Sequence, residues 1–258
     1  MRHLFTTLSR LLFPLRVGAA ALLFALPAAV CVICLPGRER RRRAAHRAGR
    51  MVFPLAGIPL KVSGFDNLPQ GPCFLACNHA SYLDGPLLMA VLPPRFGFVS
   101  KREVTRVPLL GRLMARLGSE FVERFDTKTA RNDANRLIQL ARDGVSLGVF
   151  PEGTFYREPG LQRFHLGAFI AATRAGIPVV PMIIHGSRDM LPDGTWWPRP
   201  GDLWVEMLEP IFPAGKRGDD ARTLCVAVRA QILAHCSETE RIHARMQPAP
   251  TTISAKQE

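Results

Sequence analysis

Beyond Gly64 the chain alternates short apolar runs with segments whose apolar residues recur at helical spacing. The short runs predict buried strands, and the segments with a repeat of three or four residues predict helices. The predicted strands are residues 73–77, 96–100, 119–123, 145–150, 178–184 and 203–208. The predicted helices are residues 84–92, 108–117, 127–142, 163–175 and 219–235. This alternation favours the α/β class, as a single domain with a largely parallel central sheet flanked by helices.

A different pattern fills residues 1–50. No residue from 17 to 35 is charged, and 19 residues in a helix reach about 29 Å, close to the hydrocarbon thickness of a bilayer. Seven arginines follow between residues 38 and 50, and such a cluster marks the cytoplasmic side of a membrane segment. We therefore expect residues 1–50 to be a membrane anchor, with the domain at 51–236 on the cytoplasmic face.

The form of this anchor is open on the sequence alone. Pro27 allows either one spanning helix or a kinked hairpin that enters and leaves the same face of the membrane. A cleaved signal peptide is disfavoured, because no small-x-small site follows the apolar run and the arginines lie on its wrong side. Residues 1–16 place leucines at helical spacing, which suits either an interfacial amphipathic helix or a continuation of the anchor.

Composition narrows the class of protein. With 258 residues, of which 47% are apolar, the chain can bury one substantial core, and only the polar tail at 237–258 is expected to be disordered. Residues 1–50 carry +9 of the total charge of +13, so the basicity is local and a nucleic-acid partner is disfavoured. The six cysteines show no metal or disulfide spacing, and we expect reduced, buried thiols and no bound metal.

The first chemical motif is the run Asn78-His79-Ala80-Ser81-Tyr82-Leu83-Asp84. His79 and Asp84 can act as a base and the carboxylate that fixes its tautomer, and the run holds no cysteine to serve as their nucleophile, while Ser81 lacks the pattern of one. Their spacing requires a turn, so we place His79 just after a strand and Asp84 at a helix start, where it caps free N–H groups. The alternative is that Asp84 only caps the helix and His79 is an ordinary loop residue.

A second motif, Phe150-Pro151-Glu152-Gly153-Thr154, follows a predicted strand. Gly153 lets the backbone approach a ligand and Thr154 supplies a hydroxyl, which together suit a phosphate or an oxyanion. Glu152 is anionic, so we expect it to hold a cation. An ordinary turn is the alternative.

Two further runs end at predicted strand termini. The first, residues 118–124, ends at Arg124, whose guanidinium suits a bidentate phosphate contact, although a solvated arginine is the commoner case. The second, residues 177–186, is an apolar strand that ends in a turn and is expected to form core and pocket wall.

In order and spacing these four runs resemble the lysophospholipid acyltransferase family, which includes the 1-acyl-glycerol-3-phosphate acyltransferases. The resemblance covers roughly residues 61–211. It implies transfer of a fatty acyl group from acyl-CoA or acyl carrier protein to the hydroxyl of a lysolipid at a membrane, with no cofactor. The first acceptor it suggests is 1-acyl-glycerol-3-phosphate, in phospholipid biosynthesis.

The resemblance also implies roles for individual residues. His79 matches the general base and Asp84 its orienting partner, while Asn78 supports their loop. Residues matching the acceptor phosphate site are Arg124, Glu152, Gly153 and Thr154. Lys101 matches a basic position that would stabilise the oxyanion or bind the donor phosphates.

One departure from the family pattern concerns the acceptor. Many members carry arginine directly after F-P-E-G-T, whereas this chain has Phe155, followed by Tyr156 and Arg157. Either Arg157 reaches the same phosphate, or the acceptor is another lysolipid, such as a lyso-ornithine lipid. The tryptophans Trp196, Trp197 and Trp204 suit an interfacial aromatic belt, but we favour packing on the sheet edge.

Functions of another class are a membrane-tethered hydrolase and a lipid-binding module. A hydrolase with a serine nucleophile would need a pentapeptide such as G-x-S-x-G, which does not occur in the sequence. A binding module would need neither His79 nor Asp84.

Overall fold

The computed structural model describes residues 12–123 and 127–237. Residues 1–11, 124–126 and 238–258 lie outside the described part. Three of our predictions therefore fall outside the described residues: the position of Arg124, the disorder of the tail, and most of the first amphipathic segment.

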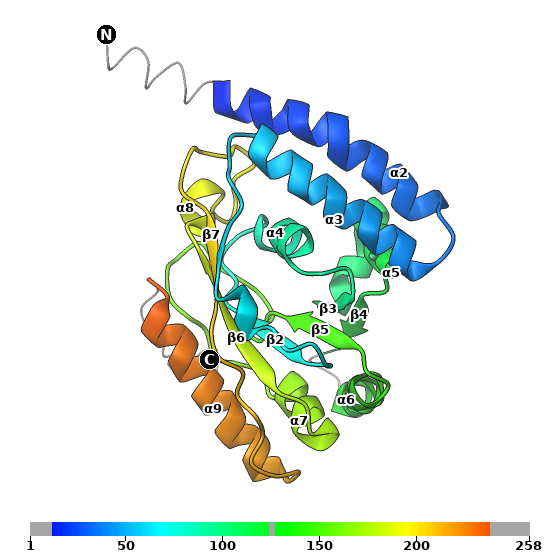
Figure 1. Ribbon diagram of the computed structural model, residues 1–258, viewed down its shortest axis with the longest axis vertical. Coiled ribbons are helices and arrows are strands. Elements are labelled where there is room, and N and C mark those ends of the chain that lie inside the picture. Colours follow the sequence, from blue (N-terminus) through cyan, green and yellow to red (C-terminus); the bar gives the residue numbers. More distant parts are fainter. Residues whose placement is uncertain (1–11, 124–126, 238–258) are drawn as a thin grey trace, which may run out of the picture.

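The described residues form one sheet of seven strands in the order β1-β7-β6-β2-β5-β3-β4 (Figure 1). Strands β6, β2, β5, β3 and β4 are parallel, while β7 pairs antiparallel with β6 and parallel with β1. This confirms the predicted α/β class with a largely parallel sheet. The strands are β1 (Lys61–Ser63), β2 (Phe74–Cys77), β3 (Phe96–Lys101), β4 (Glu120–Val122), β5 (Ser146–Val149), β6 (Val179–His185) and β7 (Trp204–Met207).

All six predicted strands are present, and β1 is the strand that the sequence pattern did not predict. Its three residues are all exposed, so it has no buried face, and it is too short for a periodic pattern to reveal it. It forms because its backbone pairs with β7 at the edge of the sheet. Edge strands of this kind carry little sequence signal.

Helices cover both faces of the sheet (Figure 1). Leu75 and Cys77 of β2 face one hydrophobic cluster with α3 and α4, while Phe74 and Ala76 face a second cluster with α6, α7 and α9. This alternation is the period of two expected of a strand that is buried on both sides. The helices are α3 (Arg38–Leu55), α4 (Asp84–Val91), α5 (Pro108–Leu117), α6 (Thr127–Arg142), α7 (Gly167–Ala175), α8 (Ser187–Met190) and α9 (Gly218–His235), with the short 3₁₀ turns η2 (Phe65–Asn67) and η3 (Arg102–Arg106).

The apolar segment forms a helix from Leu12 to Cys34 with a mean hydropathy of 2.5, long and apolar enough to cross a membrane. It includes a π-helical turn, η1 (Ala21–Ala25), directly before α2 (Leu26–Cys34). Pro27 explains this turn, because proline has no N–H to donate to the preceding turn and the helix widens there.

Helix α3 lies side by side with this apolar helix, between it and the rest of the domain (Figure 1). Arg41 Nε donates to the Leu35 carbonyl at 2.8 Å, and the Arg116 guanidinium of α5 donates to the Ile33 carbonyl. The two helices thus form a hairpin that is fastened to α5. The sequence analysis placed arginines here but did not predict that α3 runs unbroken past residue 50 to Leu55.

Some arginines of this cluster bind protein rather than face solvent. Arg42 Nε donates to the Leu117 carbonyl at 2.8 Å, and Arg42 Nη2 donates to the Gly118 carbonyl at 3.2 Å. Burial of the guanidinium, together with the nearby charge of Arg38, lowers the pKa of Arg42 to about 10. Arg42 therefore fastens α3 to the end of α5 and remains charged at neutral pH.

Helix α7 begins at Gly167, four residues later than its predicted start at residue 163. The backbone before it is committed to the loop after β5: the Gln162 N–H donates to Glu152 Oε2 at 2.7 Å and the His165 N–H donates to the Pro151 carbonyl at 2.8 Å. These two bonds hold residues 162–165 in an extended loop, so the helix starts after them.

The turn after β6 depends on Gly186, which has a φ of +80°. A Cβ at this position would overlap the carbonyl oxygen of Asp202, which lies in the loop before β7. Gly144 has the same left-handed backbone, with a φ of +81°, but open space around the position of a Cβ. Replacing each glycine by alanine therefore separates the cost of backbone strain, which both positions share, from the cost of close packing, which only Gly186 has.

We predict that Gly186→Ala destabilises the fold more than Gly144→Ala. The left-handed conformation alone costs an alanine about 1–2 kcal/mol, and the overlap with Asp202 adds to this cost only at Gly186. Denaturant unfolding of both variants in detergent measures the difference. Equal losses of unfolding free energy would show that the packing at Gly186 contributes nothing.

Candidate active site

The predicted motif loops meet at one edge of the sheet. His79 follows β2 and Glu152 follows β5, and these two strands are parallel neighbours. Their carboxyl ends therefore open onto the same crevice, which is where open α/β sheets bind ligands. Neighbouring strands thus bring together two motifs that lie 73 residues apart in the chain.

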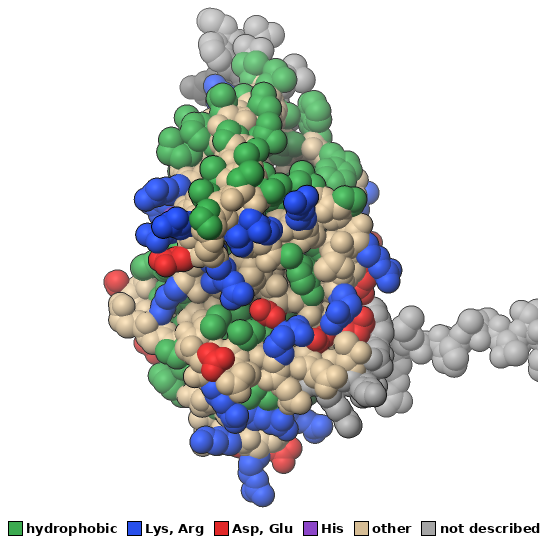
Figure 2. All heavy atoms as spheres, turned by 90° about the vertical axis from the view of Figure 1, so that its right-hand side faces the viewer, with side chains coloured by type: hydrophobic (Ala, Val, Ile, Leu, Met, Phe, Trp, Pro, Cys, Tyr) green, Lys and Arg blue, Asp and Glu red, His purple; other side chains and the backbone are tan. Residues whose placement is uncertain are grey.

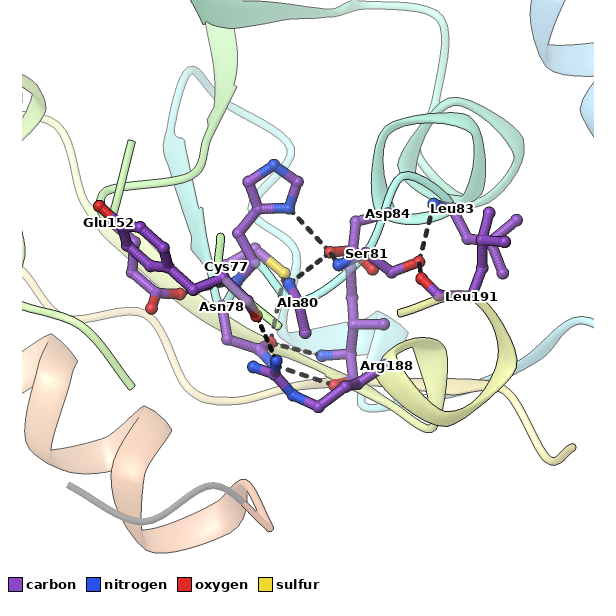
Figure 3. Close-up of polar contacts among 12 residues, drawn as sticks. Cys77, Asn78, Ala80, Ser81, Leu83, Asp84, Glu152, Arg188 and Leu191 are labelled. Atoms are coloured by element: carbon purple, nitrogen blue, oxygen red, sulfur yellow. Dashed lines mark hydrogen bonds and ion pairs between the residues drawn. The ribbon is translucent and has the colours of Figure 1, made fainter. Parts of the chain in front are cut away.

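His79 and Asp84 are paired directly, as predicted. His79 Nδ1 lies 2.8 Å from Asp84 Oδ2, and Asp84 is fully buried as the first residue of α4. The same oxygen accepts the backbone N–H of Ala80 at 2.7 Å and that of Ser81 at 2.9 Å (Figure 3). One prediction is corrected: Asp84 caps N–H groups of the loop before α4 rather than those of the helix itself.

The imidazole of His79 is held in place but remains reachable. Its side chain is 17% exposed, and its ring stacks on Phe150 with the centroids 4.0 Å apart. Because Nδ1 faces Asp84, Nε2 is the nitrogen left to meet a substrate. This is the arrangement in which a carboxylate holds the tautomer of a base.

Asn78 fastens the motif loop to β6. Its Nδ2 donates to the Ile184 carbonyl at 3.0 Å, and its Oδ1 accepts the Ile184 N–H at 2.7 Å. The buried side-chain amide thus imitates the backbone of a neighbouring strand. The structure supplies the support that we expected from Asn78.

Glu152 binds two backbone N–H groups, which the sequence analysis did not predict. Its Oε1 accepts the His79 N–H and its Oε2 accepts the Gln162 N–H, both at 2.7 Å. The carboxylate is 5% exposed, so these charge-assisted bonds are shielded from water. In the structure Glu152 therefore joins the His79 loop to the loop that precedes α7.

The remaining predicted residues are less closely grouped. Gly153 has a φ of +75° and donates its N–H to the Phe150 carbonyl at 2.9 Å, so it closes the turn beside Thr154. Arg157 is exposed on the same loop. Lys101 ends β3, which β5 separates from β2, so it reaches the same sheet edge without joining the His79 group.

Two positioning residues were missed by the sequence analysis. Ser81 is buried, donates from Oγ to the Leu191 carbonyl at 2.7 Å and accepts the Leu83 N–H at 3.1 Å. Arg188 Nη1 donates to the carbonyls of residues 156, 157 and 158. Ser81 lies inside the motif and could have been suspected, but the sequence around Arg188 gives no signal for contacts with a loop 30 residues away.

The cysteines are free thiols, as expected, but Cys34 is exposed and Cys31 and Cys236 are only partly buried. Burial, followed by the charges of Asp84 and Glu152, raises the pKa of Cys77 well above its usual value. Cys77 is therefore a protonated thiol and a poor nucleophile beside the candidate base. Within the described residues, no group of three or more His, Cys, Asp or Glu side chains is placed to hold a metal ion.

The tryptophans differ from our prediction. Trp204 does not lie at the sheet edge, because β1 flanks β7 there; its ring stacks on that of His185 of the neighbouring strand β6, with the centroids 3.7 Å apart. Trp196 and Trp197, which we expected to pack on the sheet edge too, are 85% and 65% exposed. They lie in the loop after α8, where the Trp196 ring stacks on that of Tyr82.

Comparison with known proteins shows that the chain belongs to the lysophospholipid acyltransferase family. The family model described as Acyltransferase matches residues 59–185. A lyso-ornithine lipid O-acyltransferase of Pseudomonas aeruginosa is 32% identical over 203 residues, which cover 72% of this chain and 77% of that protein.

Two other relatives extend the comparison. The chloroplast 1-acyl-sn-glycerol-3-phosphate acyltransferase BAT2 of Brassica napus is 32% identical over 74% of this chain, which spans only 56% of that protein. The crystal structure of the 1-acyl-sn-glycerophosphate acyltransferase PlsC from Thermotoga maritima matches with a TM-score of 0.69 at 22% identity, covering 88% of this chain and 96% of that one. This last match supports the fold.

We predict that Asp84→Asn leaves the protein folded but lowers acyl transfer by roughly 1,000-fold or more, the scale seen when a base loses its orienting carboxylate. The amide keeps the shape of the side chain, yet it cannot accept from Nδ1, Ala80 and Ser81 with the same charge. Steady-state kinetics together with thermal unfolding measure the two effects. Near-normal turnover in a folded Asp84→Asn protein would contradict the pairing.

Proposed function

We propose that this protein is a membrane-bound O-acyltransferase that moves a fatty acyl group from acyl-CoA or acyl carrier protein to the hydroxyl of a lysolipid. The observation that carries the proposal is the imidazole of His79, paired through Nδ1 with a buried carboxylate and open at Nε2. Family membership supports the same reaction.

The proposed reaction needs no nucleophile from the protein. The lysolipid hydroxyl oxygen attacks the thioester carbonyl carbon while His79 Nε2 takes its proton. The resulting oxyanion collapses, the carbon–sulfur bond breaks, and the thiolate leaves and recovers the proton from the imidazolium. Asp84 stabilises that imidazolium without accepting its proton.

The names of the relatives give two acceptors to consider. The Brassica protein is named for 1-acyl-sn-glycerol-3-phosphate and the Pseudomonas protein for a lyso-ornithine lipid. The specific observation in favour of the second is Phe155, which places an apolar ring 4.5 Å from the His79 ring. Candidate groups for a phosphate are the turn at Gly153 and Thr154 together with Arg124, Arg157 and Lys101.

We also propose that the N-terminal hairpin holds the site at the cytoplasmic face of a membrane. Leu15, Leu22 and Leu23 of the apolar helix are about two-thirds exposed. Figure 2 shows hydrophobic side chains gathered at this end of the molecule, with lysines and arginines below them. Such a band suits acyl chains above and anionic head groups below.

The apolar helix continues through Pro27, and the chain reverses between Cys34 and Arg38. The packing of this helix on α3 favours a hairpin that lies in one leaflet over a helix that spans the bilayer. The apolar helix lies along α3, which itself packs on α4, so it rests against the domain along its length. The bond from Arg116 to the Ile33 carbonyl holds its end there. A spanning helix would have to leave these contacts.

We predict that His79→Ala lowers acyl transfer at least as much as Asp84→Asn, by roughly 1,000-fold or more, because Asp84 acts only through the imidazole, while the protein stays folded. His235→Ala is the matched control, because His235 is half-exposed at the end of α9. Thiol release from acyl-CoA in the presence of mixed lysolipids measures both variants. A His79→Ala protein with near-normal turnover would refute the base assignment.

We further predict that Arg157→Ala raises the Michaelis constant for a phosphate-bearing acceptor more than it lowers turnover. Arg157 is exposed on the loop after Thr154, where a phosphate close to the reacting hydroxyl would lie. Initial rates against a series of 1-acyl-glycerol-3-phosphate concentrations give both constants. A loss confined to turnover would count against phosphate contact at Arg157.

A further inference from the structure

The ring of Phe155 packs directly against the candidate base. The ring of Phe155 meets the His79 ring edge-on, with centroids 4.5 Å apart and an angle of 61° between the planes. Phe150 stacks on a face of the imidazole, with the centroids 4.0 Å apart and an angle of 17° between the planes. Because Nδ1 faces Asp84, a hydroxyl that meets Nε2 of His79 carries the group attached to it within reach of the Phe155 ring.

The aromatic surface continues outward from Phe155 to solvent. The ring of Tyr82 meets Phe155 edge-on at 4.9 Å, and the ring of Trp196 stacks on Tyr82 at 5.8 Å with an interplanar angle of 8°. The exposed fractions are 47% for Tyr82 and 85% for Trp196. We refer to Tyr82, Phe155 and Trp196 as the aromatic row.

Hydrogen bonds hold this row together although its members come from three separate loops. Tyr82 donates from its hydroxyl to Asp193 Oδ1 at 3.1 Å, and Ser81 Oγ donates to the Leu191 carbonyl at 2.7 Å. Arg188 binds the carbonyl of Tyr156, directly after Phe155. The loop that carries Trp196 is thus tied to the loop that carries His79.

The chemistry of the row suits a positively charged group. Aromatic faces carry partial negative charge and attract ammonium groups, and a phosphate gains nothing from them. The carboxylate of Asp193 adds a negative charge beside the Tyr82 hydroxyl. The aromatic faces and Asp193 would therefore stabilise a cationic group on the acceptor, whereas they would not stabilise an anionic group such as a phosphate.

Resting on the proposed acyl transfer, we infer that the aromatic row is a head-group platform that selects a lysolipid carrying an ammonium group over one whose head group is only a phosphate. The ammonium group lies against the faces of Tyr82 and Trp196 while the reacting hydroxyl reaches Nε2 of His79. Both amino-acid lysolipids, such as lyso-ornithine lipid, and zwitterionic lysophospholipids offer this chemistry.

The test compares acceptors in the full-length protein in mixed micelles, with acyl-CoA as donor. The acceptors are lyso-ornithine lipid, lysophosphatidylethanolamine and 1-acyl-glycerol-3-phosphate, and the quantity is the ratio of kcat/KM for each ammonium acceptor to that for the phosphate acceptor. Comparing the first two acceptors shows which source of the ammonium group is preferred. The variants are Trp196→Ala, Phe155→Arg and, as matched control, Trp197→Ala, which removes an exposed neighbouring tryptophan.

We expect Trp196→Ala to lower the ratio about two- to five-fold, the effect of one cation–π contact at an exposed site. Phe155→Arg should lower it further and raise kcat/KM for 1-acyl-glycerol-3-phosphate, because a guanidinium repels ammonium and binds phosphate. Trp197→Ala should leave the ratio unchanged. Since Trp196 is largely exposed, its replacement spares the core.

Three results would overturn the inference. The first is an unchanged ratio in both Trp196→Ala and Phe155→Arg. The second is an equal loss of kcat/KM for all acceptors in Trp196→Ala and Trp197→Ala, which would make the tryptophans a membrane contact. The third is a change confined to the KM of acyl-CoA, which would assign the rings to the donor. If the wild-type protein acylates none of the acceptors, the proposed function itself fails, and this is a separate outcome.

Discussion

The convergence of three N–H groups on one buried carboxylate oxygen organises the whole site. A buried carboxylate is costly without hydrogen bonds, and Asp84 Oδ2 gathers three of them, from His79 Nδ1 and the backbone N–H groups of Ala80 and Ser81. The bonds bend the chain back between β2 and α4. The turn that the carboxylate requires is therefore the same turn that presents the imidazole.

The surrounding contacts extend this arrangement across the sheet. Asn78 attaches the turn to β6, and Glu152 attaches it to the loop after β5. The base is thus held from both neighbouring strands by side chains that are themselves buried. Such support keeps a reacting group in position without help from the substrate.

The class of fold and the centre of the site could be predicted because both are local in sequence. Six strands and the pairing of His79 with Asp84 follow from apolar runs, flanking glycines and prolines, and a spacing of five residues. The strand β1, the late start of α7, and the contacts of Ser81 and Arg188 arise from backbone partners far along the chain. The hydrogen bonds of Glu152 could not be predicted for the same reason, since a carboxylate in a turn does not reveal which N–H groups will face it.

The hydrogen bonds that hold the loop from Glu152 to Gln162 have a consequence for how proteins of this family diversify. Both ends of this loop are fixed by the same carboxylate, and Arg188 holds its middle through carbonyl oxygens, which every amino acid has. The hydrogen bonds that hold the His79 loop consequently do not depend on which side chains stand at positions 155–157. Substitutions in this loop can therefore change which acceptor is bound without changing the hydrogen bonds that position His79 for proton transfer.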